Sequence, residues 1–129
     1  MESVKIVIPL PPVTKKNSSQ IITVGGNPRL IPSKKYREYE KAARIFLKPL
    51  NIDYPINVKC TFYMPTRRRV DLTNLLSAAA DILVAHGVVT DDNRDVIASH
   101  DGSIVLYDKK APRTEIEITK ISNYEKWSN

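Results

Sequence analysis

One nine-residue segment constrains the fold more than any other part of the chain. In residues 56–64, INVKCTFYM, apolar side chains alternate strictly with other side chains. This period of two predicts a β-strand with one face toward a core and the other toward solvent. Pro65 follows directly and lacks the N–H group that would continue a strand ladder. The sequence therefore predicts a strand over 56–64 that ends at Pro65.

A first amphipathic helix is predicted before this strand. Ser33 is a suitable N-cap, and the helical period runs to about Lys48, where Pro49 ends it. Apolar residues fall on one face of this helix. The opposite face has a single-sign stripe of basic residues: Lys34, Arg37, Lys41, Arg44 and Lys48. Such a stripe is either a solvated face or a surface for an anionic partner.

A second helix is predicted after the strand, from Leu72 to about His86, with Gly87 as its C-cap. Its buried side is predicted to consist of large and small apolar residues at helical spacing. These are Leu72, Leu75, Leu76, Ala79, Ile82 and Leu83.

The remaining segments predict further strands. Residues 4–8 form a β-branched run, and a hairpin is predicted from 21–24 and 29–31, joined across residues 25–28. Residues 96–107 and 113–121 are typical of a closing pair of strands, with Asp101-Gly102 as either a turn or a bulge. The order of elements predicts one compact α+β domain over residues 1–129, with a mixed β-sheet and two main helices.

Composition narrows the class of protein. The 129 residues are enough for one domain, and 42% hydrophobic residues argue against wholesale disorder. A net charge of +6 favours an anionic partner, most often nucleic acid. The single cysteine, Cys60, allows no internal disulfide and is predicted to be a buried thiol. Without a long apolar run or a signal peptide, the protein is expected to be soluble and cytoplasmic, with no membrane partner.

The chemistry of a site is suggested by charges around the second helix. Three arginines, Arg67, Arg68 and Arg69, come just before Asp71, which begins the helix. A second acidic pair, Asp91-Asp92, follows the helix. Acidic residues at both ends could build an oxygen-rich site for Mg²⁺ or Mn²⁺.

Phosphodiester cleavage would use both kinds of charge. A hard cation can polarise a phosphoryl oxygen, activate water and stabilise the leaving oxygen. Arginine guanidinium groups match the geometry of phosphate oxygens and would hold the DNA backbone. A structural alternative stays open, because Asp71 is also a good helix N-cap and Asp91-Asp92 is ordinary turn chemistry.

Several motifs agree in order and spacing with a known family. They are Pro11-Pro12, Asn17, the block 67–75 (RRRVDLTNL), Asp81, Gly87 and Asp91-Asp92. In these motifs the chain resembles the RusA family of Holliday-junction resolvases. The resemblance implies a homodimeric, Mg²⁺-dependent endodeoxyribonuclease that nicks four-way or branched DNA symmetrically in recombination and repair, with members often carried by phages and prophages.

The resemblance also implies site residues. Asp71 and Asp92 correspond to catalytic carboxylates, and Asp91 is adjacent; all three are expected metal ligands. The expected DNA contacts are Arg67, Arg68, Arg69, Lys15, Lys16, Asn17 and Asn74.

The chain departs from the family pattern at two positions. Thr73 stands where the family usually has a second Asp, and Ser77 where it usually has a Lys. These departures favour the first of two alternatives to an active nuclease. One is a catalytically weakened or inactive junction-binding protein of the same fold, and the other is a basic protein-interaction domain indifferent to DNA.

The spacing of the acidic residues raises a geometric question. The helix from Asn74 to His86 is about 20 Å long at about 1.5 Å per residue. The six residues from Gly87 to Asp92 can return barely that far when fully extended. Either the chain doubles back along the helix, or Asp92 completes the site of a partner subunit. Two symmetric nicks also predict a C2 dimer.

Overall fold

The sheet is built around β4 (Ile56–Met64), the strand with strict alternation. The computed structural model describes residues 3–15 and 19–122. Ile56, Val58 and Cys60 of β4 are fully buried, whereas Lys59 is exposed. The predicted strand is therefore confirmed, with the bounds expected from its pattern.

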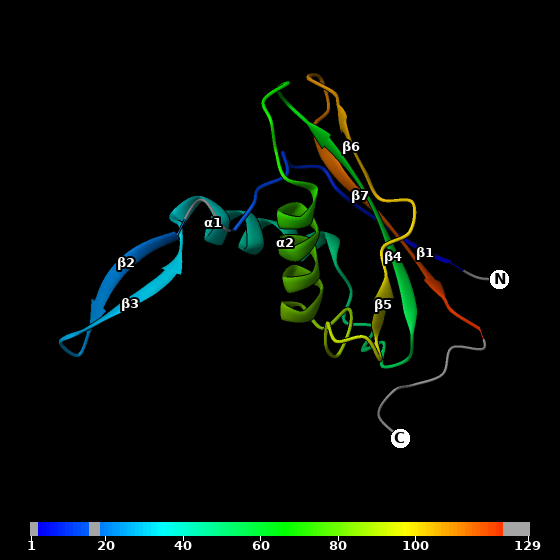
Figure 1. Cartoon of the computed structure of the whole chain (residues 1–129), viewed down its shortest axis with the longest axis horizontal. Helices are drawn as coiled ribbons and strands as arrows, with labels where there is room; N and C mark the ends of the chain where they lie inside the picture. Colours follow the sequence, from blue (N-terminus) through cyan, green and yellow to red (C-terminus); the bar gives the residue numbers. More distant parts are fainter. Residues whose placement is uncertain (1–2, 16–18, 123–129) are drawn as a thin grey trace.

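β4 has neighbours on both sides (Figure 1). On one side it pairs antiparallel with β7 (Arg113–Lys120), which in turn pairs antiparallel with β1 (Ser3–Ile8). On the other side the short strands β5 (Ile97–Ser99) and β6 (Ile104–Tyr107) both run parallel to β4. The result is the mixed five-stranded sheet of a single α+β domain.

The prediction that residues 96–107 and 113–121 form a closing pair of strands is wrong. The segment 96–107 forms β5 and β6, but β4 lies between these strands and β7. A turn at Asp101-Gly102 separates β5 from β6, and there the Ser103 N–H donates to the His100 carbonyl at 3.1 Å. Gly102 has a φ of +86°, a conformation that costs glycine little.

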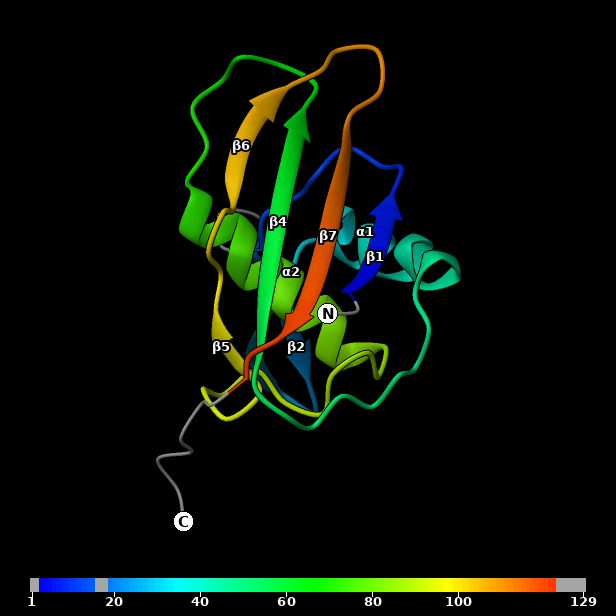
Figure 2. The ribbon, with the colours of Figure 1, turned by 90° about the vertical axis from the view of Figure 1, so that its right-hand side faces the viewer.

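Both helices cover the same face of the sheet (Figures 1 and 2). α2 (Leu72–Ala85) has Asp71 as its N-cap, and its apolar side contributes Leu75, Ile82 and Leu83 to the core. Leu72 and Leu76 are half-buried at the edge of that core. The predicted helix thus forms with its predicted inward side.

α1 (Lys34–Ala43) is shorter than predicted. Ser33 caps it as expected, because its Oγ accepts the Tyr36 N–H at 3.2 Å. The α-helix ends at Ala43 rather than near Lys48, and a 3₁₀ turn, η2 (Arg44–Phe46), follows. This tighter turn and the extended backbone of Leu47 bring the Leu47 side chain into the core. The stripe of basic residues is exposed along its whole length.

Residues 19–32 form a separate two-stranded sheet, which we call the hairpin arm. Its strands are β2 (Ser19–Val24) and β3 (Asn27–Pro32). The turn is two residues long, Gly25-Gly26, both with positive φ, so Asn27 and Pro28 belong to the strand instead of the predicted turn. A two-glycine turn matches the twist of a hairpin without steric cost. The arm extends away from the rest of the protein (Figure 1).

The core lies between the sheet and the helices. Tyr36 from α1 is buried there, and its hydroxyl donates to the Ala78 carbonyl of α2 at 3.4 Å. Burial, together with the nearby carboxylates of Asp81 and Glu40, raises the pKa of Tyr36. Burial also raises the pKa of the Cys60 thiol to about 12, so this cysteine is the buried thiol that the sequence predicted. None of the helices in the described ranges is long and apolar enough to cross a membrane.

Candidate functional site

The connection between β4 and α2 presents an exposed cluster of positive charge. We call residues 66–70 the arginine loop. Arg67 lies over the ring of Tyr107 on β6, with 4.2 Å between its Cζ atom and the ring centroid. Arg68 and Arg69 are exposed, and within residues 3–15 and 19–122 neither guanidinium forms an ion pair. Both are therefore available to an anion from solution.

Asp71 follows the arginine loop directly and is exposed at the N-terminus of α2. Its Oδ1 atom accepts the Thr73 N–H at 2.9 Å, which satisfies one of the free donors of the first helical turn. The structural role expected as an alternative is thus confirmed. A capping carboxylate uses one oxygen in this bond, and its second oxygen still faces solvent and can bind another group.

A polar row continues along α2 from Asp71 through Asn74, Ser77 and Asp81, on the side away from the leucines. Asn74 is half-buried and Ser77 is exposed. The Lys15 Nζ atom donates to Asp81 Oδ2 at 3.0 Å, so Lys15 lies beside this row. The other two predicted DNA contacts from the same segment, Lys16 and Asn17, are outside the described residues.

The acidic pair lies in the turn after α2. Asp91 is engaged locally: its Oδ1 accepts the Asp92 N–H at 2.7 Å, and its Oδ2 accepts from Asn93 Nδ2 at 3.2 Å. The carboxylate of Asp92 is exposed and has no ion pair within the described ranges. Asp92 is thus the more available of the two metal ligands that the sequence predicted here.

Asp71 caps the start of α2, whereas the acidic pair follows the end of the helix. The chain after the helix does not double back along it. Instead, the Ile52 N–H donates to the Val88 carbonyl at 3.0 Å, and Thr90 N–H donates to Ile52, close to where β4 begins. Asp71, in contrast, comes after the end of β4. Fourteen helical residues separate the two positions by about 20 Å.

Within residues 3–15 and 19–122, one chain therefore does not bring these acidic residues together into a metal site. No group of three or more His, Cys, Asp or Glu side chains placed to hold a metal occurs among the described residues. Both histidines instead contact backbone carbonyls. His86 Nε2 is 2.9 Å from the Glu40 oxygen, and His100 Nδ1 is 2.8 Å from the Val58 oxygen.

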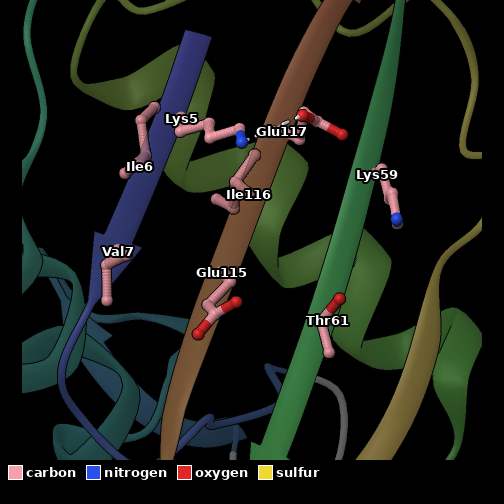
Figure 3. A pocket seen from close by; sticks show the side chains of 8 residues that line it. All are labelled: Lys5, Ile6, Val7, Lys59, Thr61, Glu115, Ile116 and Glu117. Carbon is pink, nitrogen blue, oxygen red and sulfur yellow. Dashed lines mark ion pairs between the residues drawn. The ribbon is translucent and has the colours of Figure 1, made fainter. Parts of the chain in front are cut away.

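The face of the sheet away from the helices has a different character. A shallow hollow of about 240 Å³ lies over β1, β7 and β4. In Figure 3 the charged side chains that line it, Lys5, Lys59, Glu115 and Glu117, are seen from the side of the sheet opposite α2. The hollow has cations and carboxylates side by side, and Lys5 Nζ is 3.8 Å from Glu117 Oε2. We call this surface the open sheet face.

Two contacts near the site had no signal in the sequence. The Lys15–Asp81 ion pair joins residues 66 positions apart, and Tyr107 supports Arg67 from β6, the strand beside β4. Both depend on how the N-terminal segment and β6 pack beside α2 and β4. The local sequence pattern does not show which distant residues become neighbours. The sequence could therefore suggest individual functional residues, but not these contacts between them.

Comparison with known proteins supplies an independent finding. A search among curated proteins finds no match. A family model described as "Endodeoxyribonuclease RusA" matches residues 9–119, a range that includes β4, the arginine loop, α2 and the acidic pair. This match covers most of the 129 residues, and it agrees with the resemblance carried by the block 67–75. The chain belongs to the RusA family of endodeoxyribonucleases.

Proposed function

We propose that this protein is a Mg²⁺-dependent, structure-selective endonuclease that resolves four-way DNA junctions by paired symmetric nicks. The observation that carries the proposal is the arginine loop, where two guanidinium groups that pair with no described carboxylate stand directly before an exposed carboxylate at a helix start. Family membership supports the endodeoxyribonuclease activity. The choice of junction and metal is our inference.

The arginine loop binds the DNA backbone in this proposal. Arg68 and Arg69 hold phosphates through paired N–H donors. Arg67 contributes its charge from a position held by the Tyr107 ring. The free N–H groups at the start of α2 add a further attraction for phosphate. Lys15 supplies a cation beside the polar row, and Asn74 a neutral amide within it.

The metal ligands fit Mg²⁺ when two copies of the chain are combined. Mg²⁺ is usually bound by one or two carboxylates and keeps several waters. Asp71 of one subunit and Asp92 of the other supply two exposed carboxylates, with Asp91 beside the second. When bound, the metal would polarise the scissile phosphate and activate the attacking water. Mn²⁺ has the same preference for oxygen ligands.

A homodimer follows from the same geometry. The two carboxylates are about 20 Å apart along α2 of one chain, too far to share one ion. In a C2 dimer with antiparallel α2 helices, Asp71 of each subunit meets Asp92 of the other. Two identical sites result, and they match the two-fold symmetry of a four-way junction.

Mixing two inactive variants tests the shared site. Asp71→Asn and Asp92→Asn are each expected to lose nicking of a synthetic four-way junction in Mg²⁺ by at least about a hundredfold, because each removes a metal ligand. In a mixed dimer, one site carries both substitutions and the other carries neither. Nicking should therefore return in the mixture, but at only one of the two symmetric positions.

The control is Glu117→Gln on the open sheet face, which should keep full activity. Each variant should also retain the thermal unfolding midpoint of the unmodified protein within a few degrees. Mixtures that stay inactive although mixed dimers form would contradict the shared site. Full activity of both single variants would contradict the choice of ligands.

A second candidate function is a junction-binding protein with weak or no cleavage. Thr73 and Ser77 favour it, because both are exposed near Asp71 and supply neither the negative nor the positive charge of the usual family residues. This candidate predicts salt-sensitive junction binding without nicking in Mg²⁺, Mn²⁺ or Ca²⁺. Introducing Thr73→Asp and Ser77→Lys together separates the candidates: a gain in nicking of at least about tenfold favours the weakened protein, and an unchanged rate favours the active nuclease.

A further inference from the structure

Two pairs of an arginine and a tyrosine lie at the end of the sheet where β4 stops. In one pair, the Cζ atom of Arg113 is 3.7 Å from the centroid of the Tyr63 ring. In the other, the Cζ atom of Arg67 is 4.2 Å from the centroid of the Tyr107 ring. A guanidinium group is attracted to the negative face of an aromatic ring, so both contacts are favourable. The surroundings of the two pairs, however, differ.

The first pair is satisfied within the protein. Arg113 lies directly opposite Tyr63 in the register of β7 and β4, and Tyr63 is half-buried. The Nε atom of Arg113 donates to Glu115 at 2.7 Å, and its Nη1 atom donates to Asp108 at 2.9 Å. This guanidinium therefore has two carboxylate partners and a ring, and the pair has a structural role.

The second pair is open to solvent. Arg67 forms no ion pair in the described part of the chain, and Tyr107 is 41% exposed although Arg67 lies over its ring. The register of β4 and β6 places Tyr107 beside Met64, whose side chain packs against the core. Tyr107 therefore belongs to the face of the sheet that the helices cover, the same face on which Asp71 begins α2.

The turn after β6 adds two lysines beside this open pair. The Asp108 N–H donates to the Met64 carbonyl at 3.0 Å, which places the turn next to the start of the arginine loop (Figures 1 and 2). The Oδ1 atom of Asp108 accepts the N–H groups of Lys110 and Ala111, both at 3.1 Å, and so fixes the shape of the turn. Lys109 and Lys110 are exposed, and neither forms an ion pair with any described carboxylate.

An exposed ring beside unpaired cations matches the chemistry of a nucleotide. Aromatic side chains stack on bases of any sequence, because every base has a π-face, and lysines or arginines track the phosphates. In a continuous duplex, the neighbouring base pairs cover both faces of every base. At a branch point the strands exchange partners, and this continuous stacking is interrupted. A branch point can therefore offer a base face that a duplex does not.

We propose that Tyr107 is a stacking platform for an unstacked base at the branch point of the DNA, and that Lys109 and Lys110 bind the phosphates beside that base. The proposal rests on the proposed function, in which branched DNA is the substrate. The arginine loop contacts phosphates, which duplex and branched DNA share. The platform supplies a reason for the protein to prefer the branch point.

The ratio of two affinities tests the proposal. Fluorescence anisotropy without divalent metal measures binding to a synthetic four-way junction and to a duplex with the sequence of two of its arms. Tyr107→Leu should lower junction affinity at least about fivefold, since one base loses its aromatic partner, and should change duplex affinity less than about twofold. Tyr107→Phe keeps the ring and should keep the preference for the junction.

The matched control is Tyr54→Leu. Tyr54 is 39% exposed and has Lys120 Nζ 4.8 Å from its ring centroid, but it precedes the start of β4, at the other end of the sheet. This variant should leave both affinities unchanged. The thermal unfolding midpoints of Tyr54→Leu and Tyr107→Leu should fall by similar small amounts, because each variant loses one contact between a cation and a ring.

The two lysines are tested together. Lys109→Ala with Lys110→Ala should lower the affinities for junction and duplex alike, because phosphates are common to both. The slope of log affinity against log salt should decrease by about 0.9 for each lost phosphate contact. An unchanged slope would remove the lysines from the proposed site.

A photochemical measurement locates the base. Iodouracil at the branch point should become linked on irradiation to the peptide that contains Tyr107, because a stacked aromatic ring is the favoured partner. The same nucleotide in the middle of the duplex should give no such link. Tyr107→Leu should abolish the link at the branch point, whereas Tyr54→Leu should retain it.

Every result supports or overturns the platform. Equal losses of junction and duplex affinity in Tyr107→Leu would mean that the ring acts only by holding Arg67. A loss that Tyr107→Phe shares, or an unmodified protein without preference for the junction, would also overturn the proposal. If Tyr107→Leu loses the preference but the unmodified protein never nicks, only the proposed function fails. If the protein nicks junctions and Tyr107→Leu keeps the full preference, only the platform fails.

Discussion

The arginine loop and the open sheet face are both rich in charged side chains, but they differ in whether those side chains form ion pairs. On the open sheet face, opposite charges meet one another. Arg113 Nε donates to Glu115 Oε2 at 2.7 Å, and its Nη1 donates to Asp108 Oδ2 at 2.9 Å. In the arginine loop, Arg68 and Arg69 have no carboxylate partner within the described ranges.

This difference is the reason why the proposed function assigns phosphate binding to the arginine loop and not to the open sheet face. A paired surface charge contributes modestly to folding and is partly neutralised toward any ligand. Adjacent like charges repel one another, and no carboxylate of the described residues pairs with Arg68 or Arg69 to offset that cost. A bound anion would lower their positive potential. In the proposed nuclease, an anion bound by the arginine loop would lie next to Asp71 at the start of α2.

The largest expected effect is on junction affinity, when the two arginines without ion pairs are removed. Arg68→Ala with Arg69→Ala should lower junction affinity at least about tenfold, since each charge-assisted hydrogen bond contributes about 1.5–3 kcal/mol. The slope of log affinity against log salt should decrease by about 0.9 for each lost phosphate contact. Fluorescence anisotropy at several salt concentrations measures both quantities.

The matched pair for this test is Lys5→Ala with Lys59→Ala, which removes the same net charge from the open sheet face. Affinity and salt slope should change much less there. Equal losses of junction affinity in the two double variants would mean that only the overall charge of the protein matters. The proposed difference between the two surfaces would then be wrong.

A smaller effect is expected within the arginine loop itself. Arg67→Ala should lower the free energy of unfolding by about 0.5–1 kcal/mol, because it removes the contact with the Tyr107 ring. Arg68→Ala should leave the free energy of unfolding nearly unchanged. Urea denaturation of the two variants measures the difference. A similar loss in both would show that Arg67 has no special structural role.

The smallest expected effect concerns acid stability on the open sheet face. Hydrogen bonds from the Ala111 N–H and from Arg113 lower the pKa of Asp108 below its ordinary value of 3.8. A carboxyl whose pKa is lowered by folding stabilises the protein above the ordinary pKa, and this contribution is lost as pH falls through the lowered value. Asp108→Asn should therefore reduce the unfolding midpoint at neutral pH, and the difference from the unmodified protein should shrink in acid.

Thermal unfolding between pH 7 and pH 2 measures that difference. Asp71→Asn is the comparison variant next to the arginine loop. The Asp71 carboxylate accepts a backbone N–H at the start of α2 and has no guanidinium partner among the described residues. A midpoint difference for Asp108→Asn that is constant with pH would contradict the proposed linkage.

Several features could be predicted from the sequence because they depend on local periods and caps. The alternation over 56–64 gives β4 its bounds, and Ser33 and Asp71 begin the two helices where they were expected. The family resemblance of the block 67–75 was likewise visible in the order of residues, and the family match confirms it. These signals are local because strand alternation, helical period and capping bonds all act within a few residues.

Other features depended on the tertiary structure. The sequence left open whether Asp92 returns to Asp71, and pairing of residues 87–90 with 51–52 keeps the acidic turn at the far end of α2. The placement of β4 between β7 and the pair β5 and β6 reversed the expected strand pairing. Lys15 meets Asp81, and Tyr107 supports Arg67, across long stretches of chain. Local pattern states which face of an element is buried, but only the packing of whole elements decides which distant residues meet there.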